Sequence, residues 1–231
     1  MELSRVRCLS FDCYGTIVDW ETGILDALRP VFSRHGVGMD DDEALRGFAE
    51  AEAVAEAGPF RRYREVLRDV LLALGDRFGF VPDEAELGAF PASVGAWPPF
   101  SDSAAALREL GARYRLIVLS NVDEDLFAVT ARALGVRFDA VFTAERIGAY
   151  KPSRRNFEYL IEHAGVARED ILHCAQSLYH DIAPARRAGL ATVWVNRQTG
   201  RQASATPSAD ATPDATVESL AELVELTSRA V

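Results

Sequence analysis

The sequence has 231 residues, 48% of them hydrophobic and 26% charged, which is the composition of a globular protein with a substantial core. Its formal net charge of -10 and its lack of a basic stripe argue against a nucleic-acid partner, because phosphate backbones are bound by clustered lysine and arginine. Nowhere do eighteen apolar residues follow one another, and the three cysteines lack metal-ligand spacing. We therefore expect a cytoplasmic protein with buried thiols and no contact with a membrane.

The chain begins with a strand that ends in a carboxylate. Residues 6–11 are apolar enough for a buried parallel strand, and Asp12 follows that strand, ahead of a tight turn at Gly15 and Thr16. In open α/β sheets, ligands bind beyond the carboxyl ends of the strands. Asp12 is therefore a candidate nucleophile. From this segment alone, the alternative that Asp12 only caps a turn stays open.

A long helical stretch follows and contains no convincing strand. Apolar residues recur at helical spacing in four segments separated by glycine and proline, at residues 20–34, 42–57, 60–78 and 83–94. Because the chain has just left a parallel strand, four successive helices predict an inserted helical unit.

From residue 97 onward, short strands alternate with helices. We predict strands at residues 116–119, 140–142, 171–175 and 191–195, and helices at residues 101–114, 124–134, 154–164, 181–188 and 217–229. Residues 202–213 are rich in alanine, serine, threonine and proline, and they predict a loose surface loop. The alternation is typical of an α/β fold with a doubly wound parallel sheet, a Rossmann-like core.

Polar residues follow three of the predicted strands: Ser120, Asn121, Lys151, Gln176, Ser177 and Asp181. If the sheet is parallel, they share one crevice with Asp12. Lys151 can keep a carboxylate nucleophile ionised, and Ser120 and Asn121 can donate to substrate oxygens.

Asp181 can position the water that hydrolyses an ester formed on the nucleophile, or it can fix the lysine. Each of these residues also has a structural alternative. A surface position accounts for Lys151, a helix N-cap for Asp181, and a capping turn for Ser120 and Asn121.

Four ordered motifs resemble those of the haloacid dehalogenase superfamily over essentially the whole chain. They are FDCYGT at residues 11–16, LSN at 119–121, YKP at 150–152 and AQSLYHD at 175–181. The resemblance implies a Rossmann-like catalytic core, residues 1–18 and 97–231, with a small helical cap domain at residues 19–96. It also implies that Asp12 is the nucleophile, that Ser120 and Lys151 hold the transferred group, and that Asp181 is the acid of the fourth motif.

Two positions depart from the phosphatases that make up most of this superfamily. Tyr14 stands where phosphatases have an acid/base aspartate, and Gln176 stands where they have an aspartate that binds magnesium. A neutral amide in place of a carboxylate weakens a magnesium site. Tyr14 instead resembles the type II 2-haloacid dehalogenases. That branch implies a hydrolase without a cofactor or metal, in which Asp12 displaces halide from a short 2-haloacid and water then cleaves the ester.

The dehalogenase pattern also has departures in this chain. Leu178 replaces an asparagine that helps to hold water, and His180, an alternative group for activating water, replaces a tryptophan. By position, Arg46 is the candidate for gripping the leaving halide, with a surface role as its alternative. The candidate substrate-binding residues are therefore Tyr14, Ser120, Asn121, Arg46, Gln176, Ser177 and His180.

Two other functions stay open at this point. One is a magnesium-dependent phosphatase of the same superfamily that acts on a small metabolite. The other is a protein without catalysis that binds a small carboxylate or a protein partner. The resemblance also allows a homodimer.

Overall fold

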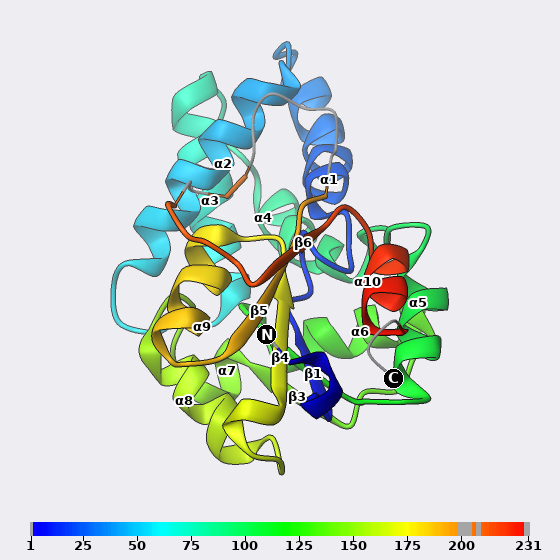
Figure 1. Cartoon of the computed structure of the whole chain (residues 1–231). Helices are drawn as coiled ribbons and strands as arrows, with labels where there is room; N and C mark the ends of the chain where they lie inside the picture. Colours follow the sequence, from blue (N-terminus) through cyan, green and yellow to red (C-terminus); the bar gives the residue numbers. More distant parts are fainter. Residues whose placement is uncertain (1, 198–204, 207–208, 229–231) are drawn as a thin grey trace.

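The fold is built on one parallel sheet of six strands in the order β3-β2-β1-β4-β5-β6. The computed structural model describes residues 2–197, 205–206 and 209–228 (Figure 1). The strands are β1 (Cys8–Phe11), β2 (Arg115–Ser120), β3 (Ala140–Thr143), β4 (Ile171–Ala175), β5 (Ala191–Val195) and β6 (Ala215–Val217). All their pairings are parallel, which confirms the doubly wound sheet.

Strand β1 lies at the centre of the sheet and is buried along its whole length. Parallel strands covered on both faces need such continuous apolar runs. The last residue of β1, Phe11, pairs with Val118 on one side and with Cys174 on the other. The chain therefore leaves β1, β2 and β4 at one edge of the sheet. The strand order reverses between β1 and β4, and such a reversal is where open α/β sheets form their binding crevice.

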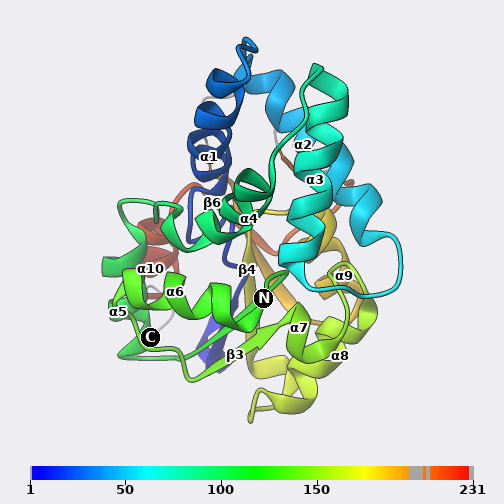
Figure 2. The same ribbon diagram turned by 180° about the vertical axis from the view of Figure 1, so that it is seen from behind.

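Helices cover the sheet and also form a separate layer. The helices around the sheet are α5 (Ser103–Gly111), α6 (Glu124–Leu134), α7 (Ala144–Ile147), α8 (Arg154–His163), α9 (Ala183–Arg187) and α10 (Leu220–Ser228). The other layer contains α1 (Trp20–Arg34), α2 (Asp41–Glu56), α3 (Tyr63–Phe78) and α4 (Glu84–Ala92). Figure 2 shows this layer at the upper end of the molecule, as does the opposite view in Figure 1.

The two connections between this helical layer and the sheet lie side by side. The Asp19 N–H donates to the carbonyl of Pro98 over 2.8 Å, and the Phe100 N–H donates to the carbonyl of Ile17 over 3.0 Å. This pairing fits an insertion into the sheet-forming chain. The division into a core of residues 1–18 and 97–231 and a cap of residues 19–96 stays a prediction.

The structure differs from the sequence predictions mainly near the end of the chain. The helix expected at residues 181–188 begins within a π-helical turn at Leu178–Ile182 and continues as α9. The Ser177 hydroxyl caps this turn, since it accepts the His180 N–H over 2.8 Å. Residues 215–217 pair with β5, so the last helix begins only at Leu220. Neither β6 nor the four-residue helix α7 was predicted.

The loop expected at residues 202–213 falls partly outside the described residues. Within it, Ala205 is fully buried and its N–H donates to Glu21 over 3.2 Å, so the loop is not loose at this point. The expected buried thiols are confirmed, since Cys8, Cys13 and Cys174 are all buried and free. In the described part of the chain, no helix has the length and apolarity needed to cross a membrane.

Helix α1 packs closely on the segment that leads back to the sheet, and this contact is testable. A Cβ atom on Gly23 would lie 2.2 Å from Cγ of Trp97. We expect Gly23→Ala to lower the free energy of unfolding by about 1–3 kcal/mol, the usual cost of overpacking a core. Urea denaturation measures this difference.

Gly88→Ala is the matched control, because a Cβ atom at this position in α4 meets no atom within 4 Å. It should leave stability unchanged or raise it by up to about 1 kcal/mol. Equal losses in the two variants would contradict the packing argument.

Candidate active site

A single ammonium group joins two carboxylates at the edge of the sheet. Lys151 Nζ donates to Asp12 Oδ1 over 2.8 Å, to Asp181 Oδ1 over 2.7 Å and to the carbonyl of Leu119 over 3.0 Å. These three bonds use all the protons of the ammonium group. Lys151 is the only lysine in the sequence, and it is 2% exposed. The alternative that it is a surface lysine is therefore wrong.

The Asn121 side chain holds the backbone of this lysine. Asn121 Oδ1 accepts the Lys151 N–H over 2.7 Å, and Asn121 Nδ2 donates to the Lys151 carbonyl over 3.1 Å. The residue after β2 is thereby tied to the residue that carries the ammonium group. Asn121 also lines the cavity described below, but its amide oxygen and one amide proton are already used.

Asp181 is fixed from a second side by a histidine inside β4. His173 Nε2 lies 3.0 Å from Asp181 Oδ1, and His173 Nδ1 lies 3.1 Å from Ser10 Oγ. Since a carboxylate only accepts, Nε2 carries a proton and donates it to Asp181. Asp181 Oδ2 is buried and has no hydrogen-bond partner among the described residues. This oxygen is therefore available to a water molecule or a ligand.

The other oxygen of Asp12 is held by the turn that follows β1. Asp12 Oδ2 accepts from the Thr16 hydroxyl over 2.7 Å, and Thr16 Oγ1 accepts the Gln176 N–H over 2.9 Å. Gly15 has a φ of 95°, which an L side chain rarely adopts. A Cβ atom on Gly15 would lie 3.3 Å from Gln176 Oε1, so Gln176 lies against the turn. It is not among the residues that line the cavity.

The charges of the three central groups depend on one another. Burial lowers the pKa of Lys151, but Asp12 and Asp181 together raise it above its ordinary value. Burial raises the pKa of Asp181, yet Lys151 and His173 bring it below the ordinary value. The pKa of Asp12 is raised by burial and by the charge of Asp181, and Lys151 offsets this only in part. The ammonium is therefore charged, and the second carboxylate is the more acidic of the two.

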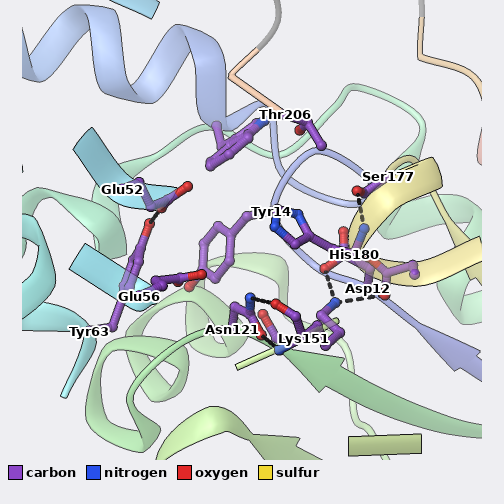
Figure 3. A pocket seen from close by; sticks show the side chains of 13 residues that line it. Asp12, Tyr14, Glu52, Glu56, Tyr63, Asn121, Lys151, Ser177, His180 and Thr206 are labelled. Carbon is purple, nitrogen blue, oxygen red and sulfur yellow. Dashed lines mark hydrogen bonds and ion pairs between the residues drawn. The ribbon is translucent and has the colours of Figure 1, made fainter. Parts of the chain in front are cut away.

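These groups line a small cavity between the sheet and the helical layer (Figure 3). Its volume of about 40 Å³ holds a few water molecules or a small organic molecule. It is lined by Asp12, Tyr14, Trp20, Glu52, Glu56, Tyr63, Ser120, Asn121, Lys151, Ser177, His180, Asp181 and Thr206. All but two of the candidate residues named from the sequence therefore meet here. The exceptions are Gln176, which lies against the turn, and Arg46.

Arg46 does not join the site. Its side chain is exposed on α2 and is not part of the cavity lining. The expectation that it grips a leaving halide is therefore wrong for this structure. The physical reason is the direction of the helix face: residues 44, 45, 47 and 48 are buried, so residue 46 points to solvent.

The candidate substrate-binding residues differ in how far their polar atoms are already engaged. Ser120 Oγ is buried and has no hydrogen-bond partner among the described residues, so it can bond to a ligand. Ser177 Oγ accepts the His180 N–H, and the Tyr14 hydroxyl lies 3.0 Å from Thr130 Oγ1. Burial lowers the pKa of His180 to about 4, so its ring is neutral at neutral pH.

Sequence reasoning missed the carboxyl groups that the helical layer contributes. Glu52 and Glu56 stand one turn apart on α2, and Figure 3 shows both facing the cavity. The Tyr63 hydroxyl donates to Glu52 Oε1 over 2.7 Å. Burial raises the pKa of Glu52 to about 7, and it raises the pKa of Glu56 well above its usual value. Their spacing of four residues was a signal, since it places both side chains on one face of a helix.

Known proteins of one family are similar to this chain in sequence and in fold. A family model described as haloacid dehalogenase-like hydrolase matches residues 6–189. The (S)-2-haloacid dehalogenase of Pseudomonas sp. (strain YL) is 33% identical over 230 residues, which are 97% of this chain and 95% of that protein. The phosphoglycolate phosphatase of Chromobacterium violaceum is 28% identical over 231 residues, 98% of each chain. The crystal structure of an L-2-haloacid dehalogenase, 25% identical, covers 96% of this chain and 99% of that one, with a TM-score of 0.78.

The shared ammonium group makes a prediction about stability. Lys151→Met leaves two buried carboxylates without a cation, which we expect to cost about 3–5 kcal/mol in the free energy of unfolding near neutral pH. Without the cation, their pKa values in the folded state rise above those of the unfolded chain. The deficit should therefore narrow as the pH falls through these raised pKa values toward about 4, because the folded variant then takes up protons that remove its buried charges. Urea denaturation at several pH values measures it.

Arg46→Met is the matched control, because it removes one cation from an exposed position on α2. We expect it to change stability by no more than about 0.5 kcal/mol. A deficit for Lys151→Met that stays constant over the whole pH range would contradict the assignment of the two carboxylates as its partners.

Proposed function

The chain belongs to the haloacid dehalogenase-like hydrolases, and on that premise we propose that it is a metal-independent 2-haloacid dehalogenase that works through an ester on Asp12. One observation carries the proposal: the buried carboxylate at the end of β1 has a protein ammonium group as its countercharge. The small cavity supports a short substrate. The proposed partner is thus a small molecule, and the homodimer stays a prediction.

In the first proposed step, a carboxylate oxygen of Asp12 attacks C2 of the 2-haloacid. A C–O bond forms as the carbon–halogen bond breaks, and the halide leaves with the electron pair. Lys151 stabilises the ionised form of Asp12 against the burial that raises its pKa. The Ser120 hydroxyl, which has no partner among the described residues, donates to the substrate carboxylate. The product of this step is an ester between the Asp12 carboxyl group and C2 of the acid.

In the second proposed step, water attacks the carbonyl carbon of that ester. Two groups on the cavity wall can accept the proton of this water: Asp181 Oδ2, which has no partner among the described residues, and the neutral ring of His180. The bond between the carbonyl carbon and the ester oxygen breaks, which releases a 2-hydroxy acid and restores Asp12. Halide, hydroxy acid and one proton are the net products.

A magnesium-dependent phosphatase is the alternative within the same family, and a phosphatase is among the relatives. The side chains at the site do not fit a magnesium ion. Both Asp12 and Asp181 bond to the ammonium of Lys151, and Gln176 and Tyr14 contribute no carboxylate. The described residues contain no group of three or more histidine, cysteine or acidic side chains that could hold a metal. This donor set supports the dehalogenase proposal over the phosphatase alternative.

The proposal predicts halide release without metal. We expect purified protein to release halide from short 2-haloacids, such as 2-chloropropionate and 2-bromopropionate, at the same rate in EDTA as in added magnesium. A halide-selective electrode measures the rate. No halide from any 2-haloacid, together with magnesium-dependent release of phosphate from small phosphate esters, would establish the alternative.

The ester intermediate makes a second prediction. With enzyme in excess and water enriched in ¹⁸O, a single turnover should place the label in the carboxylate of Asp12 and not in the hydroxy acid, because water attacks the carbonyl carbon of the ester. Mass spectrometry of the peptide that contains Asp12 measures this.

Asp12→Asn is the control, and it should show neither label nor turnover. Label that appears directly in the hydroxy acid after one turnover would contradict an ester on Asp12.

A further inference from the structure

The leaving halide must depart on the side of the carbon that faces away from the nucleophile. Displacement at a saturated carbon requires the entering and leaving atoms to lie in line. Figure 3 shows Asp12 and Lys151 on one side of the cavity, and Glu52, Glu56 and Tyr63 on the other. In the reaction proposed above, the halide therefore moves toward the wall formed by α2 and α3.

That wall offers no cation to a halide. Lys151 is the only lysine or arginine among the residues described in the cavity lining, and its three protons bond to Asp12, Asp181 and Leu119. Arg46 is exposed outside the cavity. An anion in a water-poor site without a hydrogen-bond donor is strongly destabilised, so the reaction needs donors on this wall.

The two carboxyl groups of α2 can provide such donors when they are protonated. Glu52 is buried, and its Oε1 atom already accepts from Tyr63, which leaves Oε2 for another contact. Glu56 is partly buried, and it forms no hydrogen bond or ion pair with the part of the chain that the structure describes. Burial raises the pKa values of both carboxyls, that of Glu52 to about 7, and the charge of Glu52 raises the pKa of Glu56 further.

The surroundings of this pair are mostly acidic or neutral. The titratable and charged groups that face it are Tyr63 from α3, Tyr150 and Lys151 from the segment before α8, Tyr179, His180 and Asp181 from the turn after β4, and Asp12 and Tyr14 from the turn after β1. Among them only Lys151 lowers the pKa of Glu56. The surroundings of the pair therefore favour its neutral form.

Two further observations point to a ligand between the walls. Ser120 lines the same cavity, is 2% exposed, and has an oxygen without a partner among the described residues. A wider hollow of about 310 Å³ adjoins the cavity, and both share Glu52, Glu56, Lys151 and His180. A halide that leaves the reacting carbon for the wider hollow therefore passes the two glutamates.

We propose that the protonated carboxyl of Glu56, with Glu52 beside it, donates a hydrogen bond to the leaving halide and thereby replaces a cation at this place. This inference rests on the proposed dehalogenase function. The carboxyl keeps its proton: the halide takes only the electron pair of the broken bond, and Asp12 supplies the new bond to carbon. The glutamate pair is then a leaving-group site made of neutral acids.

This assignment has a definite pH dependence for ester formation. The donor exists only in the protonated form, so the rate constant holds at low pH and falls as the pH rises through the raised pKa values, near 7 for Glu52. The rate constant also falls at still lower pH, because Asp12 must be ionised to attack the substrate. The strength of a hydrogen bond to halide increases from bromide to chloride, so the glutamate pair should raise the rate of chloride displacement more than that of bromide displacement.

The test is the single-turnover rate of ester formation on Asp12, with 2-chloropropionate and 2-bromopropionate, over a range of pH. In the wild type we expect this rate to fall at alkaline pH. Glu56→Leu removes the donor and should slow chloride displacement by about 10-fold or more, within the range known for loss of one donor to a developing charge. Bromide displacement should slow less, so the bromide-to-chloride ratio should rise.

Glu56→Gln keeps an N–H donor that does not titrate, so it should retain most of the rate and flatten the alkaline fall. Glu50→Gln is the matched control, because Glu50 is an exposed residue of α2 that bonds to Arg77 outside the cavity. It should change neither the ratio nor the pH profile.

The possible failures can be told apart. If an ester forms on Asp12 but Glu56→Leu leaves the bromide-to-chloride ratio unchanged, or the wild-type rate does not fall at alkaline pH, the inference is overturned and the proposed function stands. If no 2-haloacid forms an ester on Asp12 in the wild type or in Glu56→Gln, the proposed function is overturned, and the inference with it.

Discussion

The buried ammonium of Lys151 is the interaction on which the site depends. It bonds to the carboxylate that follows β1, to the carbonyl at the end of β2 and to the carboxylate that follows β4. Three segments far apart in the sequence are therefore joined by one buried charged group. Breaking a buried ion pair leaves an uncompensated charge, so these segments have little freedom to separate. The same bonds that hold the edge of the sheet together keep the proposed nucleophile ionised.

The balance of charge in the cavity sets the chemistry that it can support. Among the described residues, four carboxyl groups and one ammonium group line the cavity. The ammonium bonds to Asp12 and Asp181, on the side of the sheet, and not to Glu52 or Glu56. On the α2 side, burial without a cation raises the pKa of Glu52 to about 7. The charged pair of Lys151 with the two aspartates therefore lies on the side of the sheet, and the carboxyls on the side of α2 have raised pKa values.

The fold alone does not distinguish the activities found among the relatives of this chain. A dehalogenase and a phosphatase both match it over nearly the whole length. A few side chains around one carboxylate separate the two possibilities, because a magnesium ion needs anionic oxygens where this chain has Tyr14 and Gln176. The side chains of the helical layer also bear on the activity, since they form the cavity wall that faces the substrate and the leaving group in the proposed reaction. Activity in such a fold is decided by the site and not by the sheet.

The pattern of residues along the chain was enough to predict the parallel sheet and the polar residues at the ends of its strands. It also predicted the bounds of several elements to the residue, such as Trp20–Arg34 and Ile171–Ala175. Apolar periodicity is a local property, and parallel strands deliver their ends to one edge, so these features follow without knowledge of packing. The face of α2 that meets the cavity is known only from the packing of the folded chain, which places Glu52 and Glu56 at the cavity and Arg46 in solvent. It also revealed His173, whose role depends on its contact with Asp181. The rotation of a helix about its axis is set by the side chains of other elements, and no local pattern in the chain contains that information.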